Sequence, residues 1–461
     1  MRDLHVVVLA AGKGTRMKSA VPKLLHQAHG LPLIEHVIRT ASALQPASII
    51  VVVGHQAELL RAGTPAHDRM AFAVQEPQLG TGHALLQAEP FLRGARGTLV
   101  LLSGDVPLLR AETVRSLVAR HEERGAAATV VTAALEDPAG YGRIVRDGDQ
   151  LAAIVEDKDA TPEQRGIREI NSGIYALALE PLFDALRNLG TGNAQREYYL
   201  TDLIDVYRRR GLIVDAMIVA DPREVLGVNS RRELADVTAI LKSAKNQALM
   251  AAGVTLVDPA SAYIGPDVTV GPDTIVQPGV HLEGKTVVGA NCVIHAGVRI
   301  VDSTIEDGVV INNFCVIVGS HVSAGARIGP LAHIRPESRV GENAHVGNFV
   351  ELKKTSLGSG SKANHLSYLG DATIGSHVNV GAGTITCNYD GRVKSQTIIE
   401  DGAFIGSDSQ LIAPVRVGAG AYVAAGSSIT EDVPAGSLAV ARSRQVTKDN
   451  WASNKKIRDK G

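Results

Sequence analysis

A repeat of six residues runs through the second half of the chain and constrains its fold more than any other feature. A branched aliphatic residue, often followed by Gly, recurs at every sixth position, and the register slips by one residue at only a few points. The repeat opens with Ile264, Val270 and Val276 and closes with Val417, Val423 and Ile429. A sustained hexad is typical of a parallel β-helix, in which each short strand points one aliphatic side chain inward and Gly permits the turns. An antiparallel sandwich with scattered Val-Gly pairs would instead show alternating strands and hairpin turns.

The repeat breaks once, at residues 386–398. The segment CNYDGRVKSQTI is therefore predicted to be a loop inserted into the solenoid, and loops on rigid scaffolds often carry function. Because a β-helix stacks residues of successive coils into columns, polar residues about one coil apart are expected to meet. His365 is the candidate general base, since an imidazole with an unperturbed pKa of about 6.5 can accept a proton from an amine at neutral pH. Taken singly, each of these polar residues also fits a solvated edge position.

The first half of the chain alternates apolar runs with helical patterns. Strands are expected at His5–Ala10, Ser48–Val53, Thr98–Leu102 and Ala128–Thr132. Such alternation indicates an α/β domain with a mostly parallel sheet, whose ligands bind beyond the carboxyl ends of the strands. The 461 residues exceed what one core usually supports, about 100–200 residues. We predict a first domain at 1–229, a linker helix at 230–252 that begins with an S-x-x-E capping box, and a β-helix domain with a C-terminal tail at 253–461.

Residues suited to binding phosphate groups and a metal ion follow two of the predicted strands. The first strand runs into the Gly-rich turn AGKGTRM, whose spacing matches neither a dinucleotide fingerprint nor a P-loop, and Lys23 follows Pro22 where it can meet a phosphate. The third strand ends in SGDVP, and Asp105 there is a candidate Mg²⁺ ligand. Asn229 can add an amide oxygen, and the loop around Gln75 can bound a base pocket. A tight βα connection and an Asx turn are the structural alternatives.

Composition limits the partners. Lys plus Arg number 47 and Asp plus Glu 48, so no overall field attracts nucleic acid or an anionic membrane. No apolar run reaches the roughly 18 residues of a membrane span, and a cytoplasmic enzyme without stable membrane association is expected. The cysteines, Cys292, Cys315 and Cys387, form no CxxC pair, which argues against a cysteine zinc site and fits a reducing compartment.

The motifs LAAGKGTRM, PKLLH, QLGTGHA, SGDVPL and YGRIV, with ELKKTSLG, KANHLSYLGD, VGAGTITCNYDG and AAGSSIT in the second half, resemble one family over essentially the whole chain. It is the bacterial bifunctional N-acetylglucosamine-1-phosphate uridyltransferase/glucosamine-1-phosphate acetyltransferase family. The resemblance implies a Rossmann-like nucleotidyltransferase domain and a left-handed parallel β-helix of hexapeptide repeats. It also implies acetyl transfer from acetyl-CoA to glucosamine 1-phosphate and uridylyl transfer from UTP to N-acetylglucosamine 1-phosphate, with Mg²⁺, in a homotrimer whose acetyl sites lie between chains.

The same resemblance implies roles for individual residues. In the first domain, the nucleotide and sugar residues would be Leu9, Ala10, Ala11, Gly12, Lys23, Gln75, Gly80, Thr81, Ser103, Gly104, Asp105, Gly142, Glu156, Asn171 and Asn229. Of these, Asp105 and Asn229 would bind Mg²⁺. The family often has Tyr at the position of Ser103. This departure bears on any side-chain role of Ser103 and leaves the role of the nearby Asp105 unaffected.

In the second domain, His365 would be the general base. The acceptor residues would be Arg335, Lys353, Tyr368, Asn379, Asn388 and Tyr389, and those contacting acetyl-CoA would be Ala382, Ser407, Ala425 and Arg442. The basic tail 441–461 is either a solvated terminus or an arm over a neighbouring chain that helps hold coenzyme A phosphates. A monofunctional pyrophosphorylase with a scaffold β-helix is the rival enzyme, and the motifs around His365 and Asn388 weigh against it.

Overall fold

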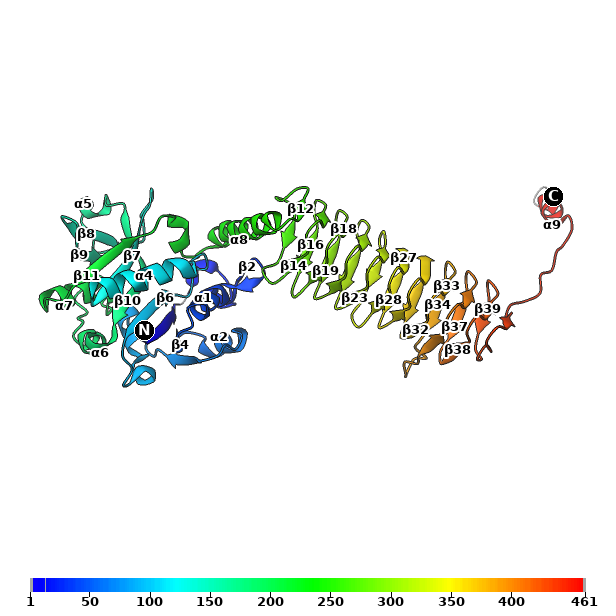
Figure 1. Cartoon of the computed structure of the whole chain (residues 1–461), viewed down its shortest axis with the longest axis horizontal. Coiled ribbons are helices and arrows are strands. Elements are labelled where there is room, and N and C mark those ends of the chain that lie inside the picture. The colour runs from blue at the N-terminus through cyan, green and yellow to red at the C-terminus, as the bar shows by residue number, and fades with distance from the viewer. Residues whose placement is uncertain (1–2, 13, 459–461) are drawn as a thin grey trace. The chain divides into compact units, whose positions relative to one another are not determined.

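The chain forms two compact units, one up to Leu241 and one from Lys242 onward. The structure is a computed structural model and describes residues 3–12 and 14–458 (Figure 1). The first unit is an α/β domain and the second is a β-helix, so the predicted fold classes are confirmed.

The sheet of the first unit is mostly parallel. Its main path runs in the order β11-β7-β10-β6-β1-β4-β5, with the hairpin β8-β9 joined to β10. β1 pairs in parallel with β4 and β6, whereas β10 runs antiparallel to both β6 and β7. The strands are β1 Leu4–Ala10, β4 Ser48–Val53, β5 Met70–Val74, β6 Thr98–Ser103, β7 Ala128–Ala134, β8 Arg143–Asp147, β9 Gln150–Val155, β10 Glu169–Ala178 and β11 Val214–Ile218.

Both faces of this sheet are covered, which explains the unbroken apolar runs of its strands. Val7 belongs to a core cluster on one face, and Val6 and Val8 belong to a cluster on the other. The helices are α1 Leu33–Ser42, α2 Ala57–Gly63, α3 Thr81–Leu86, α4 Ala111–Arg124, α5 Pro162–Arg165, α6 Leu179–Arg187 and α7 Leu203–Arg209. Three 3₁₀ turns lie near the strand ends, η1 Thr15–Met17, η2 Lys23–Leu25 and η5 Pro222–Val225.

Helix α8, Arg231–Ala251, contributes to both units. At its start the Ser230 hydroxyl accepts the backbone N–H of Glu233, whose carboxylate accepts the N–H groups of Asn229 and Ser230. Its first half packs Val237 into the first unit. In its second half, Asn246 donates to the carbonyls of Pro259 and Ala262, so this part of the helix covers the first coils of the β-helix.

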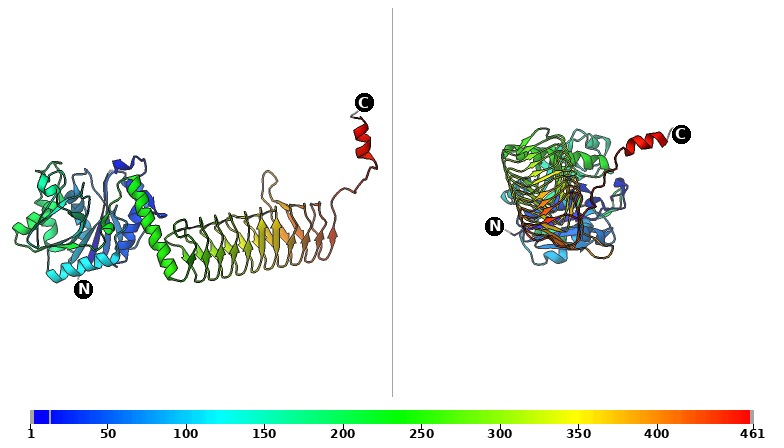
Figure 2. Two further views of the ribbon diagram at one scale, coloured as in Figure 1. Left: turned by 90° about the horizontal axis from the view of Figure 1, so that it is seen from above. Right: turned by 90° about the vertical axis from the view of Figure 1, so that its right-hand side faces the viewer.

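The second unit winds through three parallel sheets of 11, 10 and 9 strands, in which each strand pairs with the third one after it, except that β39, Tyr422–Val423, pairs with β41. One sheet runs from β12 Thr255–Leu256 to β41 Leu438–Ala439, the next from β13 Tyr263–Ile264 to β40 Ser428–Ile429, and the third from β14 Thr269–Val270 to β38 Val415–Val417. The coils stack one behind another (Figure 2). The predicted inward residues are buried, from Ile264 at 0% exposure to Ile429 at 4%, with Val270 partly buried. This arrangement fits the left-handed β-helix that the resemblance implies.

The predicted break in the repeat, 386–398, is too long. Thr386 lies in β34, Ile385–Cys387, pairs with Leu411 and is only 1% exposed, so it keeps the inward register. Its hydroxyl donates to the carbonyl of Gly370 and accepts the N–H of the same residue, which is why a polar side chain is tolerated there. The register is regained at Thr397 in β35, Thr397–Ile399. The inserted loop is therefore 388–396, and it projects from the coils (Figure 2).

Among the described residues, no helix combines the length and the apolar character that a membrane span requires.

Candidate functional site

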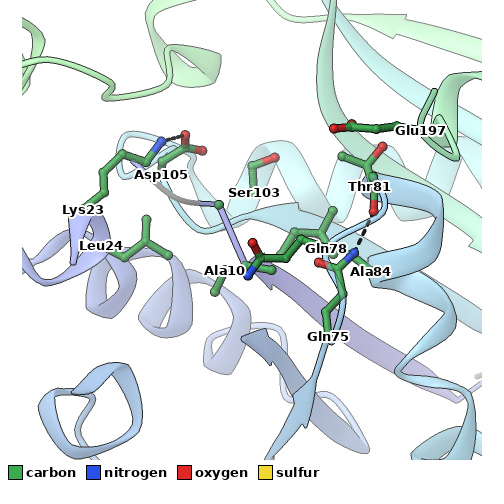
Figure 3. A pocket seen from close by; sticks show the side chains of 14 residues that line it. Ala10, Lys23, Leu24, Gln75, Gln78, Thr81, Ala84, Ser103, Asp105 and Glu197 are labelled. Carbon is green, nitrogen blue, oxygen red and sulfur yellow. Dashed lines mark hydrogen bonds and ion pairs between the residues drawn. The ribbon is translucent and has the colours of Figure 1, made fainter. Parts of the chain in front are cut away.

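A cavity of about 420 Å³ lies where β1 and β6 end, at the carboxyl edge of the sheet (Figure 3). Ten of the residues assigned to the nucleotide and sugar line it, namely Leu9, Ala10, Ala11, Gly12, Lys23, Gln75, Gly80, Thr81, Ser103 and Asp105. Leu24, Gln78, Ala84 and Glu197 also line it and were not predicted. Gln78 stands in the predicted base loop, whereas Glu197 comes from a distant segment that no local motif marks.

Glycines let the loops around this cavity approach one another. Gly14 has a φ of 60°, and a Cβ built there would lie 2.6 Å from the Cβ of Lys23. Gly80 has a φ of 106°, and a Cβ there would lie 2.7 Å from the carbonyl oxygen of Tyr198. Only Gly fits such positions without strain, so the turn after β1 closes on Lys23 and the base loop closes on Tyr198.

The ammonium of Lys23 lies between the two oxygens predicted to hold Mg²⁺. Its Nζ is 2.5 Å from Oδ2 of Asp105 and 3.0 Å from Oδ1 of Asn229 (Figure 3 shows the first contact). The N–H of Val228 donates to the Asp105 carbonyl at 2.8 Å, which fixes the Asn229 loop beside Asp105. Lys23 was assigned to the nucleotide, and here it binds the carboxylate and the amide instead. One carboxylate and one amide oxygen that already hold a cation fit a hard divalent ion, whose remaining ligands would come from substrate and water.

The base side of the cavity is ordered by Gln75. This side chain is 4% exposed, and its Nε2 donates to the Gly80 carbonyl at 2.9 Å. The Thr81 hydroxyl accepts the backbone N–H of Leu200 at 3.1 Å. A buried amide beside backbone groups can recognise a planar base by hydrogen bonds.

The remaining sugar residues surround a bulge in β10. The N–H of Asn171 donates to the Gly142 carbonyl at 2.8 Å, and Asn171 Oδ1 accepts both the Tyr175 hydroxyl and the Gly173 N–H at 3.0 Å. The pairing of β10 with β7 shifts register between Asn171 and Tyr175. A Cβ built on Gly173 would lie 3.0 Å from Oγ of Ser103, so the bulge abuts the cavity wall. Bulges often re-aim side chains beside active sites in this way.

Glu156 is the buried acid of the sugar side. Burial raises the pKa of its carboxyl, and the negative charges of Asp202 and Asp159 add to the effect against the hydrogen bond from Thr201. That hydrogen bond joins the Thr201 hydroxyl to Oε1 of Glu156 at 3.1 Å. Glu156, Gly142, Asn171, Gly104 and Asn229 do not line the 420 Å³ cavity itself. Gly173, two residues after Asn171, lies next to Ser103, and Asn229 contacts Lys23, so Asn171 and Asn229 lie beside residues that line the cavity.

On the β-helix, the predicted acceptor residues form two groups. In the first group, at one corner of the coils, Arg335 forms an ion pair with Glu351 at 2.8 Å and Lys353 forms one with Asp371 at 2.8 Å. Asn388 also donates to Asp371, and a Cβ built on Gly370 would collide with the Tyr368 hydroxyl and the Asn388 amide. Tyr389 is 59% exposed at the start of the inserted loop, where its hydroxyl donates to the Gly391 carbonyl.

The second group is His365 and Asn379, on the neighbouring sheet in strands β30, Lys362–His365, and β33, Asn379–Val380. Among the described residues, the hydrogen bonds and ion pairs of the first group do not extend to these two side chains. In one chain the acceptor residues therefore lie on two neighbouring sheets of the β-helix.

His365 has an orienting partner that was not predicted from the sequence. Its Nδ1 lies 2.8 Å from Oδ1 of Asn348, and the two residues are paired in register between β27, His345–Asn348, and β30. An amide oxygen only accepts hydrogen bonds, so Nδ1 carries the hydrogen and Nε2 is left free to accept a proton. Asn348 stands 17 residues before His365, one coil earlier, and this spacing is the signal that could have revealed it.

The residues assigned to acetyl-CoA form a column across three coils. The N–H of Asp408 donates to the Ala382 carbonyl at 2.7 Å, and the N–H of Gly426 donates to the Ser407 carbonyl at 2.8 Å. The Arg442 guanidinium donates to the Ala425 carbonyl at 2.7 Å, which ties the start of the tail to this column. The tail continues into α9, Trp451–Arg458, and residues 459–461 lie outside those described.

Three family models match parts of the chain. The MobA-like NTP transferase domain matches residues 6–198, the GMPPB C-terminal domain matches 264–335, and the bacterial transferase hexapeptide (six repeats) matches 396–431. The first match contains the cavity at the strand ends, and the other two lie on the β-helix.

Curated relatives match the chain almost end to end. "Bifunctional protein GlmU" of Koribacter versatilis is 49% identical over 464 residues, covering 100% of this chain and 98% of the relative. The proteins of the same name from Heliobacterium modesticaldum and Brevibacillus brevis are 50% and 49% identical, over 99% and 98% of this chain and of their own lengths. Identity at this level over both units, together with the site geometry, shows that the chain belongs to the family of the bifunctional protein GlmU.

Proposed function

We propose that this chain makes UDP-N-acetylglucosamine in two steps, acetyl transfer to glucosamine 1-phosphate on the β-helix and uridylyl transfer in the α/β domain. The observation that carries the proposal is the presence, in one chain of this family, of a phosphate-side cavity at the strand ends and an oriented imidazole on the β-helix. Each site supplies what its reaction needs.

In uridylyl transfer, a phosphate oxygen of N-acetylglucosamine 1-phosphate attacks the α-phosphorus of UTP, and the bond to pyrophosphate breaks. This reaction demands positioning and charge neutralisation more than proton transfer. Lys23 and the loop after β1, which line the cavity, would face the phosphates together with Arg16, while Gln75 and Thr81 would hold the base. Mg²⁺ held by Asp105 and Asn229 would neutralise developing negative charge on the phosphate oxygens.

In acetyl transfer, the amine of glucosamine 1-phosphate attacks the thioester carbonyl of acetyl-CoA. Nε2 of His365 accepts the proton that the amine loses, while Asn348 holds Nδ1–H in place. The carbon–sulfur bond breaks and coenzyme A leaves as the thiol. Arg335 and Lys353 would neutralise the acceptor phosphate, and the Ala382–Ser407–Ala425 column would bind acetyl-CoA.

We also propose that the protein acts as a homotrimer. Phe314, Leu331, Phe349 and Leu366 stand at the same turn of successive coils, each with a φ between 49° and 60°, and each is at least 44% exposed. Large apolar residues rarely adopt the left-handed conformation or remain exposed without a partner. A neighbouring chain would cover this column and complete the acceptor site, whose residues form two groups in one chain.

We also propose that this enzyme acts in the cytoplasm.

The test uses the whole purified chain with acetyl-CoA and glucosamine 1-phosphate but without UTP, and it follows release of the free thiol. Prompt release is expected. A second assay supplies UTP, N-acetylglucosamine 1-phosphate and Mg²⁺ and follows pyrophosphate. Pyrophosphate without thiol release, from a folded sample, would leave the monofunctional pyrophosphorylase with a scaffold β-helix as the correct description.

A further inference from the structure

Asp371 lies at the centre of the acceptor group, although no substrate role was predicted for it. Its Oδ2 accepts the Lys353 ammonium at 2.8 Å and also accepts the side-chain amide of Asn388. The side chains of Asp371 and Lys353 are 15% and 19% exposed, and Asn388 is 8% exposed. One largely buried carboxylate therefore contacts two of the residues that would bind the acceptor.

Backbone contacts fix Asp371 as firmly as its side chain. It stands at a turn with a φ of 48°, directly after β31, Tyr368–Gly370. Its N–H donates to the Lys353 carbonyl at 2.9 Å, and its carbonyl accepts the Thr397 N–H at 3.2 Å. Asn388 is the first residue of the inserted loop 388–396 and Thr397 directly follows its last residue, so Asp371 contacts both ends of that loop.

The electrostatics favour an ionised carboxylate at this position. Burial opposes ionisation, but the hydrogen bonds from Lys353 and Asn388, with the positive charges of Lys353 and Lys394, hold the pKa of Asp371 below its ordinary value. The same contact with Asp371 is the main reason that the pKa of Lys353 lies above its ordinary value. Lys353 is thus kept as an ammonium and in one orientation.

We propose that Asp371 is a positioning residue of the acetyl-acceptor site, whose carboxylate orients Lys353 and Asn388 toward the phosphate of glucosamine 1-phosphate. The proposal rests on the proposed acetyltransferase function. A long Lys side chain retains much rotational freedom unless a partner fixes it, and that freedom would have to be lost when the phosphate binds. Because Asp371 already fixes Lys353, this rotational freedom is lost before the phosphate binds. Gly370 next to it leaves the space that the Tyr368 hydroxyl and the Asn388 amide enter.

The experiment compares the full chain with its Asp371→Asn variant, which keeps the shape and removes the charge. Loss of a charge-assisted hydrogen bond should raise the KM for glucosamine 1-phosphate roughly tenfold. The KM for acetyl-CoA and the uridylyl transfer rate should stay close to those of the wild type. In a Lys353→Met background, the effect of Asp371→Asn on the acceptor KM should largely disappear, because the two changes act through one contact.

Asp302→Asn is the matched control. Asp302 is an acidic turn residue with a φ of 47° in an earlier coil, and its Oδ1 accepts the Lys285 N–H at 2.8 Å. This variant should leave both KM values unchanged. An unchanged or lowered acceptor KM in Asp371→Asn, or an equal rise for both substrates, would overturn the positioning role. Absence of thiol release from the wild-type chain would instead overturn the proposed acetyltransferase function.

Discussion

The Lys23 contact predicts that, in the absence of nucleotide, the ammonium competes with divalent ions for Asp105 and Asn229 in the α/β domain. The ammonium already neutralises Asp105 and contacts Asn229, at 2.5 and 3.0 Å, so an ion that takes these oxygens must displace it. Lys23→Met keeps the length of the side chain and removes this competitor. Without nucleotide, the variant should therefore bind Mn²⁺, used as a paramagnetic substitute for Mg²⁺, more tightly than the wild type.

The magnitude follows from the contacts. A charge-assisted hydrogen bond contributes about 1.5–3 kcal/mol, and each 1.4 kcal/mol is about tenfold in affinity. The side chains of Lys23 and Asp105 are 12% and 24% exposed, so solvent screens the pair in part and the lower figure applies. We expect a gain of about tenfold in Mn²⁺ affinity.

Electron paramagnetic resonance of free Mn²⁺ measures this affinity without any turnover. In the same variant, uridylyl transfer should fall by about 10²-fold, since a cation at the phosphates is lost, while acetyl transfer stays normal. Asp105→Asn is the control, because it removes the charge of the proposed ligand and should weaken Mn²⁺ binding. Unchanged or weaker Mn²⁺ binding by Lys23→Met would refute the competition between ammonium and metal.

Four further outcomes are expected. His365→Ala should lower acetyl transfer by about 10²- to 10⁴-fold and spare uridylyl transfer, and parallel loss of both in rate assays would indicate misfolding instead. Asn348→Ala should lower the kcat of acetyl transfer by about tenfold, the effect of about one lost hydrogen bond, with an unchanged acetyl-CoA KM; normal kcat would remove Asn348 from the mechanism. Asp105→Ala should abolish pyrophosphate release and leave the thermal transition of the β-helix in place, and near-normal turnover would rule out the metal assignment. Burial raises the pKa of Glu156 above 4.5, so the folded chain retains a proton that the unfolded chain releases, and stability falls as pH rises from about 4.5 through the folded pKa. The Tm of Glu156→Gln relative to that of the wild type should therefore climb over that window and then level off. A Tm difference that stays constant with pH would contradict this expectation.

The sequence predicted the β-helix almost residue by residue because its period reports burial directly. Each inward position contacts only the coils before and after it, so a local pattern is sufficient. The prediction was wrong at Thr386, where a hydroxyl bonded to the Gly370 backbone replaces an aliphatic side chain. A hydrophobic pattern has no means of recognising an inward residue whose polar group is satisfied.

In the α/β domain, apolar runs located the central parallel strands but not the direction of β10. That strand runs antiparallel between β6 and β7 and carries Asn171 on a bulge, a result of pairing between distant segments. Motifs located the residues that line the cavity because those residues cluster in short loops. Asn348 and Asp371 were missed because each acts through a partner that is distant along the chain, and Glu197 was missed because it reaches the cavity from a segment far from the motifs that line it.

Pairing of strands only between neighbouring coils has a consequence for how this molecule can change over evolutionary time. Whole coils can be gained or lost at positions far from His365 with little effect on the chemistry, because no strand depends on a remote one. A single residue inserted between Asn348 and Asp371 would be different. It would shift one layer against the next and separate His365 from Asn348 or Lys353 from Asp371, so this stretch of the solenoid should tolerate substitutions far better than changes in length.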